Sequence, residues 1–264
     1  MLTHTFCHIP RLGAHTEREL WRSGCRHWDY FLEHSHEFST GAVSRDEAKR
    51  AIEESTQALS ERNHQYFADS LSSKEAWRAW PEFGDKIYYL DIETDGGQSG
   101  DSITTVGLYD GKDFVCLVKG QDLGDFPDVI SRAGMLVTFF GQGFDIPMLK
   151  KAFPMVPFDQ IHLDLCFALK RVGVRGGLKK IEKQFGIARG DETDGLSGMD
   201  AIRLWRQYQR GDDSSLETLI EYNREDVVNL EVLAAITYGK LRDETLGMAG
   251  LSPADFDQPS ARLF

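Results

Sequence analysis

Residues 86–94 read KIYYLDIET, and this stretch decides the fold. Its β-branched and aromatic residues favour a strand, and two carboxylates come where that strand ends. Because side chains alternate between the faces of a strand, Asp91 and Glu93 share one face, roughly 7 Å apart. Adjacent carboxylates at the end of an apolar strand are electrostatically unfavourable. They indicate either a polar strand end entering a turn or part of a functional site.

Further strands are expected downstream of this stretch. Residues 103–109 continue the strand pattern, and Asp110-Gly111 separates them from residues 112–118, which is typical of a hairpin with antiparallel strands. Residues 135–140 form a short apolar run that indicates a buried strand, and one more short strand is expected at 161–163.

Helices are expected on the faces of this sheet. Their predicted ranges are 146–153, 165–172, 177–186, 197–209 and 214–240. Three meandering strands followed by strand–helix–strand units predict an α/β fold with a mixed sheet flanked by helices.

The N-terminal region is expected to be helical. Thr16 is predicted to cap a helix that stops at Gly24, and a second short helix follows at 27–32. A charged helix is predicted over 44–67, where Ser44 and Glu47 have capping-box spacing, and another over 74–80. After residue 243, glycines and prolines indicate a loosely held tail. The predicted divisions are 1–40, a helical connector at 41–83, the α/β domain at 84–242 and a C-terminal tail at 243–264.

The composition is that of a globular protein, with 41% hydrophobic and 27% charged residues. No apolar run approaches the roughly 20 residues that cross a bilayer, and the N-terminus carries no apolar signal core, so no membrane association and a cytoplasmic location are expected. The four cysteines are widely spaced, which favours free thiols over disulfides.

The charge is unevenly distributed along the chain. The net charge of -12 opposes a nucleic-acid partner, yet residues 170–189 hold seven Lys and Arg against Glu182 alone. A basic stripe on an acidic body suits an enzyme that grips a short stretch of phosphate backbone. A solvated helix face is the alternative.

Two later acidic positions can meet the first pair. Asp145 follows the strand at 135–140, where it suits a helix cap, and Gly141 allows close approach of the backbone to another group. Tyr222 and Asp226 are four apart on the last long helix, so they share one face, at the border of its apolar stripe. Each feature alone has an ordinary structural explanation.

The combination of these positions predicts a metal site. Unit charges about 4 Å apart repel by about 4 kcal/mol at an effective dielectric of 20, so four ionised carboxylates need cations to stay together. Oxygen-rich clusters of this kind bind Mg²⁺ or Mn²⁺.

The motifs resemble those of a known enzyme family. Asp91-x-Glu93, Asp145 and Tyr222-x-x-x-Asp226 are similar to the three motifs of the tyrosine-type DEDD 3′–5′ exonucleases in the RNase H-like superfamily. The similarity extends over about 84–240 through FDIPML at 144–149, HLDL at 162–165, GLK at 177–179 and YNREDV at 222–227, a pattern of the YprB-like branch. It implies a five-stranded sheet, two metal ions and nucleotide release from a 3′ end.

The resemblance assigns roles by position. The metal ligands would be Asp91, Glu93, Asp145 and Asp226, and Tyr222 would orient the attacking water, because a phenol with a pKa near 10 is a poor general base. Thr94, Gly141 and Lys179 are candidate substrate contacts. The chain has Phe140 where relatives commonly have asparagine before the glycine, so a polar contact to substrate is absent.

Residues 9–16 are similar to a helix–hairpin–helix element, whose turns offer N–H groups to phosphates, although Arg11 replaces its first glycine. Packing or partner docking is the alternative. Zinc at Cys7-His8 and Cys25-x-His27 is disfavoured by their spacing.

The leading hypothesis is an exonuclease of DNA repair that uses two Mg²⁺ or Mn²⁺ ions on single-stranded DNA or DNA ends, with DNA favoured over RNA. The alternatives are a silent RNase H-like binding module that recruits a partner, such as a helicase, and an RNase H-type endonuclease.

Overall fold

The computed structural model describes residues 1–256. The chain forms two compact units, one with residues 1–84, 159–161 and the chain from 238, the other with residues 85–158 and 162–237. No helix within the described residues has both the length and the apolar character needed to cross a bilayer.

The second unit is built on a five-stranded sheet in the order β3-β2-β1-β4-β5. The strands are β1 (Ile87–Thr94), β2 (Ile103–Tyr109), β3 (Phe114–Val118), β4 (Met135–Thr138) and β5 (Ile161–Asp164). β1 is antiparallel to β2 and parallel to β4, and β2 is antiparallel to β3. The predicted mixed sheet and antiparallel hairpin are therefore confirmed. The connection covers residues 110–113 and not Asp110-Gly111 alone, so β3 begins two residues later than predicted.

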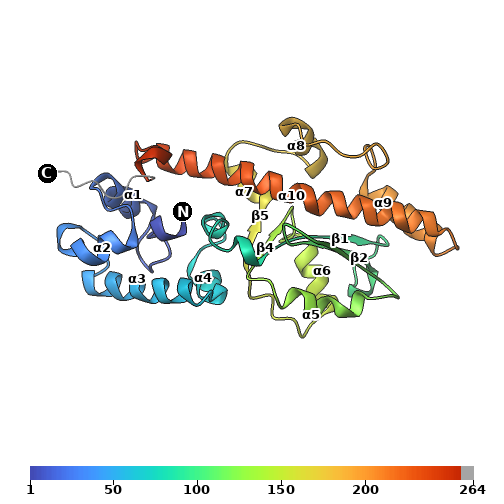
Figure 1. Ribbon diagram of the computed structural model, residues 1–264, viewed down its shortest axis with the longest axis horizontal. Coiled ribbons are helices and arrows are strands. Elements are labelled where there is room, and N and C mark those ends of the chain that lie inside the picture. Colours follow the sequence, from blue (N-terminus) through green and yellow to red (C-terminus); the bar gives the residue numbers. More distant parts are fainter. Residues whose placement is uncertain (257–264) are drawn as a thin grey trace. The chain divides into compact units, whose positions relative to one another are not determined.

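Helices cover both faces of this sheet, with α5 and α6 on one side and α10 on the other (Figure 1). The helices of this part of the chain are α5 (Phe126–Ile130), α6 (Asp145–Ala152), α7 (Leu165–Arg171), α8 (Leu178–Phe185), α9 (Gly198–Tyr208) and α10 (Asp213–Gly247), with 3-10 turns η4 (Gly84–Lys86), η5 (Gly100–Ser102) and η6 (Leu123–Asp125). The predicted helices are confirmed, and α10 runs past the expected end at residue 240. The sequence analysis missed α5, whose five residues are too few to show a periodic pattern.

The side chains on the two faces of β1 have different surroundings. Leu90 and Ile92 are buried in a core cluster with Phe126 of α5 and Met148 of α6. Alternation along the strand sends Asp91 and Glu93 to the opposite face, which α10 covers. A separate apolar cluster forms there around Trp205, Leu219 and Tyr222, with Val118 and Leu204. The core therefore fixes the strand that presents both carboxylates.

The first unit is helical. Its elements are η1 (Leu2–His4), α1 (Ala14–Arg22), α2 (Trp28–His34), η2 (Ser35–Glu37), α3 (Arg45–Ser60), α4 (His64–Ser70), η3 (Ala76–Ala79) and η7 (Pro253–Asp255). The predicted capping box of Ser44 and Glu47 at the start of α3 is present.

Three predictions for this unit are wrong in detail. Gly13, not Thr16, is the N-cap of α1, so the helix begins one turn earlier in the chain. The predicted helix over 44–67 breaks because Arg62 adopts a left-handed conformation, and Asn63 then caps α4. The residues at 74–80 form only a short 3-10 helix, η3.

The segment after 243 is not loosely held within the described residues. Arg22 donates hydrogen bonds to the carbonyls of Ala249 and Met248, and Arg26 donates to that of Asp255. The part of the predicted tail at 257–264 lies outside the described residues. Residues 243–256 are therefore an ordered part of the first unit.

A buried carboxylate lies next in sequence to residues 9–16, the segment that is similar to a helix–hairpin–helix element. The buried Glu17 carboxylate accepts from the backbone N–H groups of Phe6 and Cys7, and Arg78 pairs with it at 2.8 Å. Arg11, at the position of the missing glycine, takes the left-handed conformation with φ 69°. The amides of Phe6 and Cys7, which precede the segment at 9–16, are therefore already bound within the protein.

Candidate metal centre

Three of the predicted carboxylates meet on the α10 side of the sheet. Asp91 and Glu93 extend from β1 and Asp226 from α10, and one oxygen from each lies within 4.8 Å of the others. Glu93 and Asp226 are buried. The three groups line a pocket of about 600 Å³ that also contains Asp145 and Tyr222. The structure therefore brings all five residues of the predicted site together.

Asp145 differs from the other three acids in its orientation. It is the first residue of α6, one position after the N-cap Phe144, and its Oδ1 accepts a hydrogen bond from the Ile92 N–H at 3.1 Å. It does not belong to the group of three oxygens within 4.8 Å. One carboxylate oxygen of Asp145 is thus engaged by β1.

Burial makes this cluster unfavourable when every acid is charged. It raises the pKa of Asp91 well above the usual value, and the negative charges of Asp145 and Asp226 raise it further. Burial and Asp226 likewise raise the pKa of Glu93. The pKa of Asp145 rises to about 7, mainly through burial. Four acids in this state favour either bound protons or bound cations, and an all-oxygen donor set fits Mg²⁺ or Mn²⁺.

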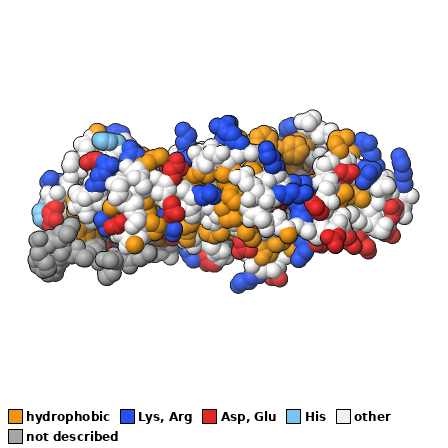
Figure 2. Space-filling model, turned by 90° about the horizontal axis from the view of Figure 1, so that it is seen from above, with side chains coloured by type: hydrophobic (Ala, Val, Ile, Leu, Met, Phe, Trp, Pro, Cys, Tyr) orange, Lys and Arg blue, Asp and Glu red, His pale blue; other side chains and the backbone are white. Residues whose placement is uncertain are grey.

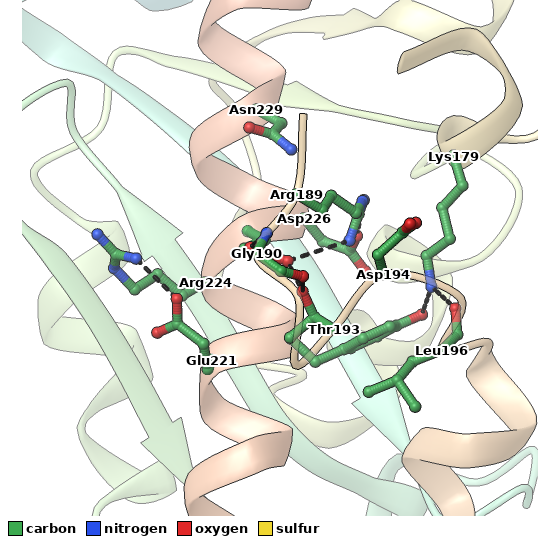
Figure 3. A network of polar contacts seen from close by, with 12 residues as sticks. Lys179, Arg189, Gly190, Thr193, Asp194, Leu196, Glu221, Arg224, Asp226 and Asn229 are labelled. Carbon is green, nitrogen blue, oxygen red and sulfur yellow. Dashed lines mark hydrogen bonds and ion pairs between the residues drawn. The ribbon is translucent and has the colours of Figure 1, made fainter. Parts of the chain in front are cut away.

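Tyr222 is held by Lys179. The Lys179 ammonium donates to the Tyr222 hydroxyl at 2.5 Å, lies 3.9 Å from the centre of its ring, and also donates to the carbonyl of Leu196 (Figure 3). Burial, followed by the charge of Asp226, raises the pKa of Tyr222 above its usual value. The phenol therefore stays protonated and cannot act as a general base near neutral pH.

A buried arginine compensates part of the negative charge. Arg189 makes two hydrogen bonds of 2.8 Å to Glu182 of α8. It also forms an ion pair with Asp226 (Figure 3). Asn229 donates to the same Glu182 carboxylate at 3.0 Å. The Arg189 and Glu182 side chains are only 3% and 1% exposed. The single positive charge of Arg189 is therefore shared between Glu182 and Asp226 of the acidic cluster.

The chain around Arg189 is fastened to α10 by Glu225. The Glu225 carboxylate accepts from the Gly190 N–H at 2.6 Å and from the Thr193 hydroxyl. Its Oε2 lies 3.9 Å from Arg189 Nη1, which is too far for a hydrogen bond. Two consecutive acids of α10, Glu225 and Asp226, thus hold the segment between α8 and α9.

Asn223 is a site residue that the sequence analysis missed. Its amide donates to the Asp91 carboxylate at 3.1 Å, and the side chain is fully buried. Gly107 lies opposite Asp91 in β2, and a Cβ there would sit 2.1 Å from Asn223 Oδ1. A glycine is therefore required at 107 for Asn223 to reach Asp91. The signal available in the sequence was that Asn223 precedes Asp226 by three residues, a spacing that shares a helix face.

Asp164 organises the loop between β4 and α6. It caps α7 by accepting from the Cys166 N–H, and it also accepts from the N–H groups of Phe140 and Gln142, all at 3.0 Å. The loop that leads into Asp145 is thus tied to the end of β5.

The three predicted substrate contacts occupy different environments. Lys179 lines the pocket, whereas Thr94 and Gly141 do not. Gly141 is explained by packing, since a Cβ there would lie 2.3 Å from the Thr138 hydroxyl. The Thr94 hydroxyl accepts from the Gly96 N–H at 3.4 Å.

The basic stripe is only partly a surface feature. Lys and Arg side chains gather on the face shown in Figure 2, over the part where Figure 1 places α8. The exposed basic residues of the stripe are Lys170, Arg171, Arg175, Lys180 and Lys183. Arg189 is instead buried, Lys179 faces Tyr222, and Lys183 pairs with Asp194 at 3.1 Å. Five of the seven predicted charges are therefore exposed at the surface.

A mixed five-stranded sheet with acids from β1, α6 and α10 in one pocket defines an RNase H-like fold. A family model described as RNase_H superfamily matches residues 88–238, more than half of the chain, and the chain belongs to that superfamily. No curated protein matches it. RNase H-like domains hydrolyse phosphodiester bonds with divalent metals or bind nucleic acid, so a nucleic-acid-directed function follows for this chain.

Proposed function

We propose that this protein is a divalent-metal-dependent 3′–5′ exonuclease acting on DNA ends in repair. The observation that carries the proposal is the pocket in which Asp91, Glu93 and Asp226 place oxygens within 4.8 Å of one another, with Tyr222 and Asp145 on its wall. The exposed basic residues beside α8 supply attraction for a phosphate backbone in a chain of net charge -12.

The metal ligands would be Asp91, Glu93, Asp226 and the free carboxylate oxygen of Asp145. When bound, two Mg²⁺ or Mn²⁺ ions supply positive charge at the attacking and leaving oxygens of an in-line displacement. Asn223 holds the Asp91 carboxylate through the 3.1 Å hydrogen bond and so orients one ligand.

The remaining residues position the reactants. The hydroxyl oxygen of Tyr222 accepts from Lys179, so its own proton is free to donate to water or to a phosphate oxygen. Because the pKa of this phenol is raised, the hydroxyl orients the water and does not deprotonate it. Lys179 adds a positive charge on the wall of the pocket, where a phosphate would lie.

The test is hydrolysis of labelled single-stranded oligonucleotides in Mg²⁺ and in Mn²⁺. A 5′-labelled strand should shorten stepwise, and a 3′-labelled strand should release labelled mononucleotide at once. Asp145→Asn should abolish the reaction. Asp128→Asn, on the exposed side of α5 across the sheet, is the matched control and should retain it. Full activity in Asp145→Asn would remove Asp145 from the mechanism, and cleavage of a circular strand would replace the exonuclease with an endonuclease.

A silent binding module is the second candidate, and two observations favour it. Asp226 is already paired with Arg189, and one oxygen of Asp145 is taken by the Ile92 N–H. Oxygens engaged in this way are less available to cations. Tight oligonucleotide binding without turnover in either metal would establish this alternative.

A further inference from the structure

Phe140 lies in the loop between β4 and α6. Its side chain is 48% exposed, which is unusual for a phenylalanine, and it lines the same pocket as Asp91, Asp145 and Tyr222. Its backbone has φ 65°, a left-handed conformation that is rare for an aromatic residue. Strain of this kind persists only where the surrounding structure enforces it, and it concentrates at binding sites.

The structure enforces the position of Phe140 from several sides. Its N–H donates to Asp164 Oδ1 at 3.0 Å, and its carbonyl accepts from the N–H of Gly143 at 3.0 Å. The ring lies so close to Gly143 that a Cβ there would be 2.6 Å from the ring's Cζ. The backbone thus supports one part of the ring while almost half of the side chain stays open to solvent.

A second exposed aromatic ring lies beside the first. Phe167 of α7 is 43% exposed, and its ring centre is 6.0 Å from that of Phe140, at an interplanar angle of 40°. Asp164 connects the two positions, because it caps the helix that carries Phe167 and binds the Phe140 N–H. The backbone segments that carry the two rings are therefore anchored by the same carboxylate.

We infer that Phe140, supported by Phe167, is a stacking platform for the unpaired nucleobase at the end of the strand in the pocket. Three observations select this occupant. The platform is continuous with the acidic cluster, Lys179 and Lys180 line the same pocket for the phosphates, and a fixed ring stacks on a base at little cost in conformational entropy. The inference rests on the proposed function and narrows its substrate to strands with an unpaired end, with tolerance for base identity.

The experiment compares binding of two single-stranded oligonucleotides by fluorescence anisotropy in Ca²⁺, with product analysis to verify that both stay intact. One carries an ordinary 3′-terminal nucleotide and the other a 3′-terminal abasic residue. The variant Phe140→Asn removes the ring and keeps a residue that tolerates the left-handed backbone. Phe140→Trp keeps an aromatic face. Val232→Ala, at a side chain that is also 48% exposed but lies outside the pocket lining, is the matched control.

We expect that the loss of affinity caused by Phe140→Asn and the loss caused by the 3′-terminal abasic residue do not add when the two changes are combined. Phe140→Asn should weaken binding of the ordinary strand by about 5- to 150-fold, the range for loss of one stacked base. It should leave binding of the abasic strand within about twofold, and Phe140→Trp and Val232→Ala should bind like wild type. Equal losses on both strands, or none on either, would overturn the platform, including the case in which the exposed ring serves a protein partner.

The binding cycle and the hydrolysis assay separate the two proposals. If wild type shows the binding cycle but no turnover in Mg²⁺ or Mn²⁺, the platform stands and the exonuclease assignment fails. If wild type degrades strands and Phe140→Asn binds both oligonucleotides as wild type does, the exonuclease stands and the platform fails. A thermal unfolding midpoint of Phe140→Asn equal to that of wild type shows that the variant is folded.

Discussion

Replacement of Arg189 by methionine tests the charge balance of the site. The change removes the cation that makes two 2.8 Å hydrogen bonds to Glu182 and pairs with Asp226, where neither acid is more than 8% exposed. Breaking a buried ion pair by removing one partner costs about 3–5 kcal/mol, because an uncompensated charge remains buried. We expect Arg189→Met to lower the free energy of unfolding by that amount in metal-free buffer.

The matched control is Arg203→Met. Arg203 pairs with Asp200 at 3.0 Å but is 61% exposed, so the same substitution should cost less than about 1 kcal/mol. The double variant Arg189→Met/Glu182→Met removes both charges of the buried pair and should be more stable than Arg189→Met alone by at least about 1 kcal/mol.

The assay is urea denaturation followed by far-UV circular dichroism, with and without Mn²⁺. Without Arg189, cations have no competitor for Asp226, so Mn²⁺ should stabilise Arg189→Met more than Arg203→Met. The reasoning is refuted if Arg189→Met costs no more than Arg203→Met, or if Mn²⁺ stabilises the two variants equally.

Two further predictions concern Gly107 and His162. Gly107→Ala should lower the free energy of unfolding by about 1–3 kcal/mol and weaken Mn²⁺ binding in calorimetry, because the new Cβ would force Asn223 away from Asp91. Gly124→Ala, where a Cβ meets open space, is the control. Equal behaviour of the two variants would contradict the prediction. Burial lowers the pKa of His162 from 6.5 to about 4, so the unfolded chain takes up a proton there more readily than the folded protein does. The free energy of unfolding should therefore decrease by up to about 3 kcal/mol as the pH falls from 6.5 to 4. His162→Gln should show a shallower acid dependence of unfolding than wild type, and parallel curves would contradict it.

Local patterns in the sequence predicted most of the fold of the second unit, because they depend only on neighbouring residues. The strand at KIYYLDIET and the antiparallel hairpin after residue 109 both form as predicted, although the connection covers residues 110–113 and not Asp110-Gly111 alone. In the first unit, the capping box at Ser44 also forms as predicted. The break at Arg62 did not show in the sequence, because no glycine or proline marks it and its left-handed backbone is fixed only after folding.

The candidate site also contains residues that the sequence predicts and residues that it does not. Tyr222 and Asp226 were predicted to share a face because helical spacing determines it, and the structure places both in the pocket. The burial of Arg189 was not predictable, since in the sequence it is one basic residue of a positively charged stretch. Its inward position depends on Glu182 and Asp226, which come from two different helices.

The alternation along β1 separates the residues that keep this protein folded from those that form its candidate metal centre. Leu90 and Ile92 build the core, whereas Asp91 and Glu93 repel their acidic neighbours. A neutral residue at Asp91 would relieve that repulsion, so loss of the chemistry would carry no penalty in folding and would even make the metal-free protein more robust. Descendants of this sequence can therefore lose the acidic residue at position 91 without selection on folding stability opposing the change.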